Sequence, residues 1–583
     1  MKNMEKLFRT HTCGNLTQGD ITKEIIISGW VKDIRINKFG IFIDLRDMYG
    51  TTQVIVKPDN GYYQEIKNVK VESVLKVIGT VVLRKNKDAK TANDMIEVVA
   101  KDIEILSNSI NLPFVIKNDN TLGSEELRLQ YRYLDLRRPA MNYNIKFKHQ
   151  VLSCLRTFLN QNNFLEIDTP CLTKSTPEGA RDFLVPARIQ KKHFYALPQS
   201  PQIYKQLLMI SGIDKYYQIA KCFRDEDFRA DRQPEFQQLD LEMAFSTSKE
   251  IKLIVENMLI SLFNTLKVGN IPSTFSSITY DQAMDLYGSD KPDLRCTCKL
   301  INININNNSD GFIYKGFIVN DKMNETTIKK LTEISNQHGG KTLIIYDLIK
   351  KKNIHNNSKV KFDDLVLSEE ISKIKYNNNF LIFVYEQQDI ANKVMGAIRI
   401  FYINDLSKRI NHKDFMNNIE NFEFIWIIDW PMFEQEENKW QACHHPFTSP
   451  KNPEKLLDIK NKDLGTLTAD AYDLVLNGFE IAGGSIRIHD YKLQKKIFEL
   501  LDLSKTEIKN KFGFFLSAFN YGVPPHGGIA FGIDRLLMIL IKNESIRDTI
   551  AFPKNNRGIC LLTNSPSEIS SDQLSILNLE FKK

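Results

Sequence analysis

Two alternating segments joined by a charged stretch constrain this chain more than any other feature. Residues 216–224 and 237–244 each mix β-forming residues with an alternation of polar and apolar side chains, which predicts a hairpin with a long loop. Because side chains alternate along a strand, the second strand has a polar face and an apolar face. The polar face carries Gln238, Asp240 and Glu242, and the apolar face carries Leu239, Leu241 and Met243. One face is suited to chemistry and the other to packing.

The loop between these strands is rich in charges of both signs. Arg224, at the end of the first strand, can bind a phosphate through its planar guanidinium, while the acidic side chains after it can hold a metal or hydrogen-bond a base. A solvated surface loop would show similar charges. The whole string resembles motif 2 of class II aminoacyl-tRNA synthetases, in particular that of bacterial-type aspartyl-tRNA synthetases: FRDEDFRADRQPEFQQLDLE.

Length and composition limit the alternatives without selecting a function. A chain of 583 residues is too long for one core and predicts about three or four domains. A net charge of +7 is a mild bias that does not establish nucleic-acid binding. Eight cysteines are scattered without paired C-x-x-C spacing, so neither a zinc site nor a disulfide framework is expected. With neither a signal-peptide apolar region nor an apolar run of bilayer length, we expect a cytoplasmic protein without membrane contact.

Residues 1–112 predict a small β-barrel, because short β-rich runs follow one another at near-regular spacing. Arg35, Phe42 and Gln53 offer a cation, a ring and an amide, which suit splayed single-stranded bases, although an alternating Phe42 could equally be a core residue. The strings GWVKDIR and IFIDLRDMYGTTQV resemble the OB-fold anticodon-binding domain of aspartyl-tRNA synthetases. The resemblance implies that Arg35, Phe42, Gln53 and Glu97 contact the anticodon of tRNA(Asp).

Residues 113–143 form a charged, proline-bounded hinge, and residues 144–290 then begin the catalytic domain. Val151, Leu155, Phe158 and Leu159 recur at helical spacing, and an extended segment follows that stops at Pro170. Taken alone, this is a buried helix and a strand. It resembles motif 1 of class II enzymes, which implies a homodimer formed through this element.

Two loops of the first catalytic half carry polar residues suited to substrate contact, STPEGARDFLVP and LPQSPQIYK. Lys205 supplies a cation for a carboxylate and Glu178 an acceptor for an ammonium group, a pair that would recognise an acidic amino acid. Each residue by itself could be merely solvated. Both loops resemble those of aspartyl-tRNA synthetases, which places Glu178, Ser200, Gln202 and Lys205 at the aspartate.

Residues 291–415 separate the two catalytic halves and predict an inserted α+β domain with its own core. The string MGAIRI resembles the bacterial insertion domain, whereas FVYEQQD stands where the family tends to have a Gly-Ala-Asp string. The sequence assigns no role to this domain.

The second catalytic half, residues 416–560, carries further polar candidates. His444 and His445 are consecutive in a loop without other ligand clusters, which favours hydrogen bonding to substrate over metal binding. Asp473 and Glu480 lie on neighbouring extended segments and suit Mg²⁺, and Arg487 can bind a carboxylate. The resemblance assigns Glu480 to ATP and Mg²⁺ and Arg487 to the aspartate side chain. Asp240 would orient Arg487 or accept a hydrogen bond from the substrate ammonium.

The string GGIAFGIDRLLMILI predicts a glycine-rich strand that passes into an apolar helix and resembles motif 3. Gly527, Gly528 and Gly532 are expected to leave room for a flat base against the backbone. Arg535 near the helix start is expected to add its charge to the positive end of the helix dipole and to face ATP phosphates. No G-x-x-x-x-G-K-[ST] string is present, so the expected nucleotide site is not a P-loop. Residues 561–583 form a polar C-terminal extension.

The expected fold is therefore a multi-domain α+β protein: an N-terminal OB-fold β-barrel, a class II antiparallel catalytic sheet with flanking helices, and the inserted domain. The resemblance implies a two-step aspartate–tRNA ligase with ATP and Mg²⁺, in which Arg224, Glu480 and Arg535 are catalytic. The expected aspartate-binding residues are Glu178, Ser200, Gln202, Lys205, Arg224, Asp240, His444, His445 and Arg487. The expected ATP-binding residues are Arg224, Asp225, Glu226, Gln233, Glu480, Gly532, Ile533, Asp534 and Arg535. Two alternatives stay open: a sister synthetase for asparagine or lysine, and a non-catalytic RNA-binding relic.

Overall fold

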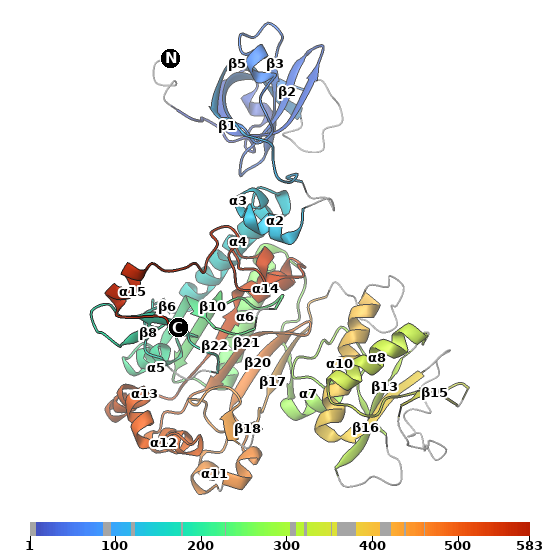
Figure 1. The fold of residues 1–583 in the computed structure, drawn as a ribbon, viewed down its shortest axis with the longest axis vertical. Coiled ribbons are helices and arrows are strands. Elements are labelled where there is room, and N and C mark those ends of the chain that lie inside the picture. Colours follow the sequence, from blue (N-terminus) through green and yellow to red (C-terminus); the bar gives the residue numbers. More distant parts are fainter. Residues whose placement is uncertain are drawn as a thin grey trace. The chain divides into compact units, whose positions relative to one another are not determined.

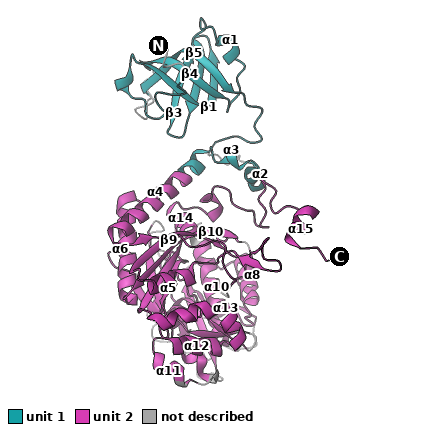
Figure 2. Ribbon diagram, turned by 90° about the vertical axis from the view of Figure 1, so that its left-hand side faces the viewer, with its two compact units in different colours: residues 1–143 teal, residues 144–583 magenta. Residues whose placement is uncertain are grey.

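The chain forms two compact units, residues 1–143 and 144–583 (Figure 2). The computed structural model describes residues 7–84, 95–117, 123–175, 179–227, 229–303, 311–319, 323–350, 352–357, 380–407, 421–436, 439–459 and 461–582. The finer division expected from the sequence, with a hinge at 113–143 and an insertion at 291–415, stays a prediction.

The first unit contains a closed five-stranded barrel in the order β1-β2-β3-β5-β4. Its elements are β1 (Glu24–Asn37), β2 (Gly40–Arg46), β3 (Thr51–Val56), α1 (Tyr63–Ile66), β4 (Val74–Leu83) and β5 (Ile96–Ser107). The alternation seen in the sequence sets the two sides of the wall: Ile41, Ile43 and Leu45 fill the barrel, so Phe42 faces outward. Two short helices follow, α2 (Glu125–Gln130) and α3 (Arg132–Asp135).

The second unit is built on an eight-stranded sheet in the order β11-β17-β20-β21-β22-β10-β9-β6 (Figure 1). The strands are β6 (Leu165–Glu166), β9 (Lys215–Phe223), β10 (Glu235–Ala244), β11 (Ser276–Thr279), β17 (Phe424–Ile428), β20 (Ala471–Leu476), β21 (Phe479–Ile486) and β22 (His526–Gly532). The six central strands are antiparallel, as expected, and the edge strands β6 and β11 pair in parallel. The central hairpin β9–β10 is the one that the alternating segments predict.

Helices cover both faces of this sheet. The side chains Val151, Leu155 and Leu159 pack with Leu239 and Leu241 in one core. Their helix is α4 (Pro139–Gln161), and α6 (Ser248–Leu266) and α14 (Ile533–Leu540) contribute to the same core. A second core holds α5 (Gln202–Ile210), α12 (Tyr491–Leu500) and α13 (Lys505–Ala518). The apolar face predicted for the second hairpin strand therefore packs into the main hydrophobic core.

The insertion forms its own five-stranded sheet in the order β12-β13-β16-β14-β15 (Figure 1). Its strands are β12 (Ile301–Ile303), β13 (Phe312–Val319), β14 (Ile344–Asp347), β15 (Lys352–Asn356) and β16 (Phe380–Gln387), and its helices are α8 (Glu325–Gln337) and α10 (Gln388–Ser407). A separate apolar core lies between this sheet and its helices, which gives the α+β layer expected from the sequence. Helix α7 (Tyr280–Tyr287) precedes the insertion and contacts α10.

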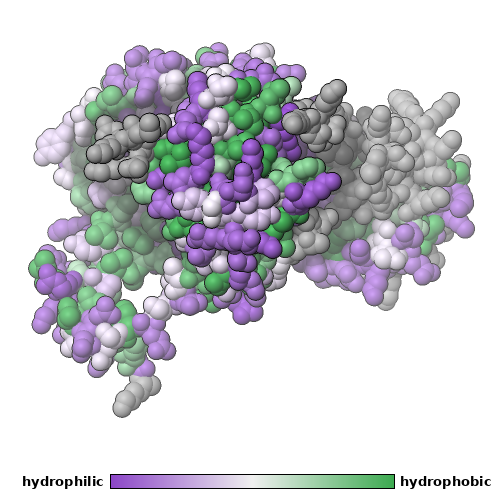
Figure 3. Space-filling model, turned by 90° about the horizontal axis from the view of Figure 1, so that it is seen from above, coloured by the Kyte–Doolittle hydropathy of each residue, from purple (hydrophilic) through white to green (hydrophobic). Residues whose placement is uncertain are grey.

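Smaller elements complete the second unit. They are β7 (Leu184–Pro186), β8 (Phe194–Ala196), β18 (Phe433–Glu436), β19 (Lys439–Ala442), α11 (Pro453–Asp458) and α15 (Ser571–Leu577). Among the described residues, no helix is long and apolar enough to cross a membrane. On the face drawn in Figure 3, hydrophilic and hydrophobic side chains are interspersed.

Candidate active site

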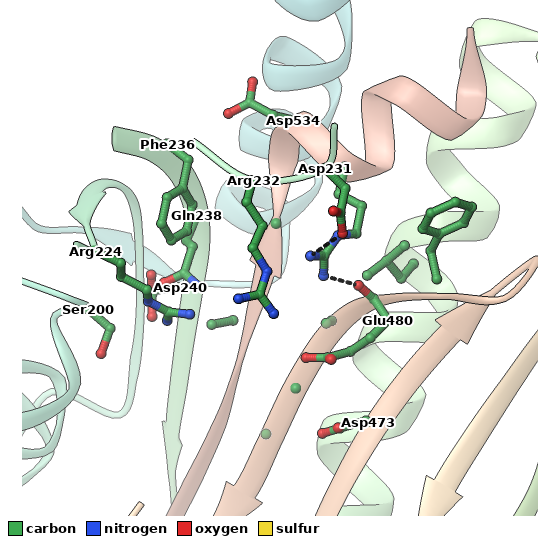
Figure 4. Close-up of a pocket in the computed structure, with 18 of the residues that line it drawn as sticks. Ser200, Arg224, Asp231, Arg232, Phe236, Gln238, Asp240, Asp473, Glu480 and Asp534 are labelled. Atoms are coloured by element: carbon green, nitrogen blue, oxygen red, sulfur yellow. Dashed lines mark hydrogen bonds and ion pairs between the residues drawn. The ribbon is translucent and has the colours of Figure 1, made fainter. Parts of the chain in front are cut away.

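A cavity of about 660 Å³ lies on the polar face of the central strands. Its walls come from segments far apart in the sequence: α5, the hairpin β9–β10, the loop that carries His444 and His445, the strands β20, β21 and β22, and α14. Figure 4 shows that Arg224 and Asp240 lie near Ser200, with Glu480 and Asp473 placed apart from them on neighbouring strands. The cavity therefore has two chemically different ends.

One end holds a buried network of two cations and two carboxylates. Lys205, Asp240, Glu242 and Arg487 are each at most 2% exposed. The Lys205 ammonium lies 3.0 Å from Asp240 Oδ1 and 3.6 Å from Glu242 Oε2. Arg487 donates from Nε to Glu242 Oε1 at 3.0 Å. Burial of charge is tolerated here because every charge has an opposite partner within reach.

The structure contradicts one of the two roles expected for Asp240. In the structure, Arg487 is hydrogen-bonded to Glu242. The expectation that Asp240 orients this arginine is therefore wrong. The reason is geometric: Glu242 lies two residues further along the same face of β10 and hydrogen-bonds both Nε and Nη2 of the guanidinium. Asp240 Oδ2 is buried and has no hydrogen-bond partner among the described residues. Acceptance of a substrate ammonium by this oxygen stays a prediction.

Electrostatics at this end follow from burial and pairing. Burial raises the pKa of Asp240, although Lys205 opposes the shift. Burial also acts to raise the pKa of Glu242, but Arg487 and Lys205 outweigh it and bring that pKa below its ordinary value. Glu242 is therefore the fixed anion of the network.

The two consecutive histidines have different partners. His445 Nε2 accepts a hydrogen bond of 2.5 Å from Arg487 Nη1, so this nitrogen carries no proton. Burial, and after it the charge of Arg487, lowers the pKa of His445 well below the usual range. His444 packs edge-on against Trp430 with ring centroids 4.9 Å apart, and its buried Nε2 finds no hydrogen-bond partner within the described ranges. Burial lowers the pKa of His444 to about 4. Both rings are neutral at pH 7.

Arg224 lies at the mouth of this network. Its guanidinium stands 5.2 Å from the centre of the Phe236 ring, so the ring holds it in place by a cation–π contact. Glu226 is tied to Arg232 at 2.8 Å. The charged hairpin loop thus supplies ordered arginines to the cavity and is not merely a solvated surface.

The other end of the cavity holds a carboxylate pair beside a lysine. Glu480 and Asp473 both line it, and Lys291 lies 3.0 Å from Glu480 Oε2. Burial, and then the nearby Glu480, raises the pKa of Asp473 well above the usual range. Burial opposes ionisation of Glu480 as well, but Lys291 and Arg535 outweigh it and lower that pKa. In the part of the chain that the structure describes, the buried Asp473 Oδ1 has no hydrogen-bond partner.

Arg535, in the first turn of α14, closes this end. It donates from Nη1 to the Glu480 carbonyl oxygen at 2.7 Å and from Nη2 to Asp231 at 3.2 Å, as the dashed lines in Figure 4 mark. Its Nε is buried and lacks a hydrogen-bond partner among the residues that the structure describes. The guanidinium is therefore held from two sides, by Glu480 and Asp231.

Three residues expected at ATP have other tasks in the structure. The Asp534 carboxylate lines the cavity but is bound to Lys148 at 2.6 Å and to the Gln237 amide at 3.2 Å. Ile533 is fully buried in the main core, and Asp225 pairs through its backbone with Arg181. Neither Ile533 nor Asp225 lines the cavity.

The remaining expected residues of the pocket lie at its wall. Gln233 lines the cavity and holds the backbone of Lys554 through two hydrogen bonds, of 2.8 and 3.0 Å. The cavity is also lined by Ser200, Gln202, Glu226 and Gly532. Glu178 lies outside the described residues.

One motif 3 glycine makes space for a side chain. A Cβ on Gly528 would lie 2.0 Å from Glu242 Oε2 and 2.2 Å from the Leu241 carbonyl oxygen. Gly528 faces Glu242 across the β10–β22 pair. The expectation that this glycine leaves room for a base is wrong, because the Glu242 carboxylate occupies that space.

Sequence reasoning missed Glu242 and Lys291. Glu242 carried a signal, since it shares the polar face of its strand with Asp240. Lys291 carried none, because it lies in the loop that leads into the insertion and reaches the cavity only through tertiary packing.

On the barrel, the residues expected at the anticodon share the outer wall. Arg35 opposes Phe42 between β1 and β2, and Gln53 opposes Asp44 between β2 and β3. Phe42 is partly exposed, and Arg35 forms a 3.0 Å ion pair with Asp44. Glu97 opposes Val82 and lies between the inward-facing Ile96 and Val98. Phe42 is therefore not a core residue of the barrel.

Comparisons with known proteins agree with both units. A family model described as tRNA synthetases class II (D, K and N) matches residues 124–556, and one described as an OB-fold nucleic acid binding domain matches residues 25–106. The aspartate–tRNA ligase of Malacoplasma penetrans is 44% identical over 590 residues, which cover 98% of this chain and 99% of that protein. The aspartate–tRNA ligase of Mycoplasma mycoides is 43% identical over 99% of this chain and 100% of that protein.

Solved structures show the same fold at lower sequence identity. Asparaginyl-tRNA synthetase from Pyrococcus horikoshii, complexed with asparaginyl-adenylate, superposes with a TM-score of 0.59 at 18% identity, and the match covers 93% of this chain and 97% of that one. A family model that spans well over half of the sequence, together with near end-to-end relatives, decides the assignment: the chain belongs to the class II tRNA synthetases of the D, K and N family.

Proposed function

We propose that this enzyme is an aspartate–tRNA ligase, which activates L-aspartate with ATP and transfers it to tRNA. The observation that carries the proposal is the buried network of Lys205, Asp240, Glu242 and Arg487, open to the same cavity as Arg224 and Glu480. The named relatives that match end to end are aspartate–tRNA ligases.

Recognition of aspartate follows from the charges of this network. Lys205 and Arg487 attract the distal carboxylate, and Asp240 Oδ2 is an unpartnered acceptor for the ammonium group. Because the substrate ammonium would pair with Asp240, asparagine in the same place would bring that ammonium without a distal carboxylate and leave one buried positive charge uncompensated. Loss of a polar pairing of this kind can discriminate by roughly 10⁴-fold. A lysine substrate would add a cation where two are already buried.

Activation requires positioning and charge stabilisation. The α-carboxylate of aspartate attacks the α-phosphorus of ATP in line, so that the bond to pyrophosphate breaks and aspartyl-adenylate forms. Arg224, held against Phe236, lines the cavity at the end that carries Asp240, and from there it would stabilise charge on the α-phosphate as the α-carboxylate attacks. Arg535 faces the phosphates from the positive end of α14.

Mg²⁺ fits the residues present. Within the described ranges, no group of three or more His, Cys, Asp or Glu side chains is arranged to hold a metal ion. Mg²⁺ needs only one or two carboxylates when phosphate oxygens and waters complete its shell, and the unpartnered Asp473 Oδ1 beside Glu480 provides them. The ion would neutralise phosphate charge there.

Transfer to tRNA completes the proposed reaction. The terminal ribose 3′-hydroxyl of tRNA attacks the aspartyl carbonyl of the adenylate, and AMP leaves. The outer barrel wall with Arg35, Phe42, Gln53 and Glu97 would bind the anticodon, and a homodimer would form through α4 and β6.

Pyrophosphate exchange tests the assignment directly. The purified enzyme is mixed with ATP and labelled pyrophosphate, and aspartate, asparagine or lysine is added in turn. We expect aspartate alone to drive rapid exchange. Equal exchange with asparagine or lysine would indicate an asparaginyl- or lysyl-tRNA synthetase instead. No exchange with any of the three amino acids would contradict synthetase activity.

A second candidate function concerns the tRNA. The relative from Thermoanaerobacter pseudethanolicus, 42% identical over 99% of this chain, is named aspartate–tRNA(Asp/Asn) ligase. Charging of purified tRNA(Asp) and tRNA(Asn) in parallel decides between a single and a dual tRNA substrate.

A further inference from the structure

Lys291 lies among carboxylates at the nucleotide end of the cavity. Its ammonium is 3.0 Å from Glu480 Oε2 and 3.6 Å from Asp290 Oδ2, and Lys291 and Asp473 both line the cavity. The Lys291 side chain is 41% exposed, so it is not a buried structural pair. It places a positive charge beside the carboxylates that would receive a divalent cation.

The first end of the segment that carries Lys291 is fixed by a glycine pair. Gly288, in the left-handed conformation at the end of α7, packs against Gly396 of α10. A Cβ on Gly396 would lie 2.0 Å from the Gly288 carbonyl oxygen, so only glycine permits this approach. Lys291 follows this contact by three residues.

The other end is fixed by an arginine of the insertion. Arg399 of α10 is 1% exposed and stacks over Tyr287 at 4.9 Å. It donates hydrogen bonds to three backbone carbonyl oxygens, those of Asp293 at 2.9 Å, Cys296 at 3.1 Å and Cys298 at 2.7 Å. The insertion therefore contacts the segment that carries Lys291 both before and after the lysine.

The segment also touches the turn that carries Glu480. A Cβ on Gly478, in the tight turn between β20 and β21, would lie 3.3 Å from Asp293 Cβ. The loop with Lys291 and the turn before Glu480 are thus packed against each other, and their charged groups meet at a defined place.

We infer that Lys291, positioned by the insertion, is a counter-cation that stays paired with the Glu480 carboxylate until a metal–nucleotide complex binds. This pairing disfavours the binding of a divalent metal ion without nucleotide. The inference rests on the proposed placement of Mg²⁺–ATP at Asp473 and Glu480. An ammonium already paired with Glu480 competes with a second cation for the same oxygen, whereas a metal that comes with ATP brings phosphate oxygens that can accept the displaced ammonium. Lys291 is a positioning residue in this scheme.

Metal binding in the absence of nucleotide tests it. Mn²⁺ is titrated into the full-length enzyme, and free ion is measured by electron paramagnetic resonance. Lys291→Met keeps the aliphatic stem and removes the charge, so we expect Mn²⁺ to bind about tenfold or more tightly than to the wild type. Lys291→Arg should bind Mn²⁺ like the wild type. Equal or weaker binding by Lys291→Met would overturn the inference.

Two controls locate the effect. Lys495→Met removes a similarly exposed lysine that pairs with Glu499 on α12, and it should leave Mn²⁺ binding unchanged. Adding Asp473→Asn to Lys291→Met should abolish the gain in affinity, and a gain that survives would place the metal elsewhere and overturn the inference. Failure of the proposed function would appear separately, as absence of aspartate-dependent exchange by the wild type.

Discussion

Glu242 determines how the aspartate end of the cavity is charged. It is fully buried, it pairs with Arg487 and Lys205, and Gly528 leaves the space that its carboxylate needs. By holding both cations in place, it lets them face a substrate carboxylate without rearranging. Removing one member of a buried pair is costly, about 3–5 kcal/mol, because the other charge stays buried.

Replacing Arg487 tests this network. In Arg487→Leu, we expect aspartate-dependent pyrophosphate exchange to fall by more than about 100-fold in kcat/KM, since the distal carboxylate loses its arginine. ATP binding, measured by calorimetry, should stay near the wild-type value because Arg224, Glu480 and Arg535 are intact. Near-normal exchange would remove Arg487 from the aspartate site.

The buried His444 makes stability depend on pH. Its folded pKa is about 4, while an exposed histidine in the unfolded chain titrates near about 6.5. Unfolding therefore takes up a proton between these values, so stability is fully present above about pH 6.5 and is lost as the pH falls toward about 4. His444→Gln should flatten part of this decline in chemical-denaturation curves, and an unchanged slope would contradict a buried neutral His444.

At the scale of elements, the hairpin β9–β10 is held in register by what packs behind and beside it. Leu239 and Leu241 face the core, while Asp534 at the start of α14 joins this helix to β10 and α4 through Gln237 and Lys148. An aspartate in the first turn also interacts favourably with the positive end of the helix. Its contacts indicate an anchoring task for Asp534.

Asp534→Asn should therefore affect stability more than ATP binding. The change breaks a short ion pair with Lys148 and removes the charge at the helix start, so we expect unfolding to become about 1–3 kcal/mol easier. The KM for ATP in exchange should change less than about threefold. A large rise in KM with unchanged stability would return Asp534 to the nucleotide site.

At the scale of the whole molecule, the two units carry separable parts of the reaction. All the described residues that line the cavity belong to the second unit. The barrel offers a different surface, an outer wall with a partly exposed ring beside a cation. Activation of aspartate and selection of tRNA can therefore be disrupted independently.

Phe42→Ala tests this separation. Loss of one stacked base costs about 1–3 kcal/mol, so the KM for tRNA in aminoacylation should rise by about 5- to 160-fold. Exchange without tRNA should stay at the wild-type rate. If both activities fell together, Phe42 would be a structural residue of the barrel.

The sequence by itself predicted the main elements and several residues that line the cavity. Alternation in residues 237–244 predicted a strand with a polar and an apolar face, the spacing of Val151, Leu155 and Leu159 predicted the buried helix, and the motif strings supplied Arg224, Glu480 and Arg535. These signals are local, since side-chain periodicity follows from backbone geometry alone.

Only the tertiary structure decided which charges pair. Arg487 is 245 residues from Glu242. Glu242 and Asp240 lie on the same face of one strand, so the sequence does not tell which of the two carboxylates pairs with Arg487. Lys291 lines the cavity because Arg399 of α10 is hydrogen-bonded to the loop that carries the lysine. These two segments are about 100 residues apart in the sequence. Pairing depends on distances of a few ångströms between distant segments, and those distances exist only once the sheet and the insertion are assembled.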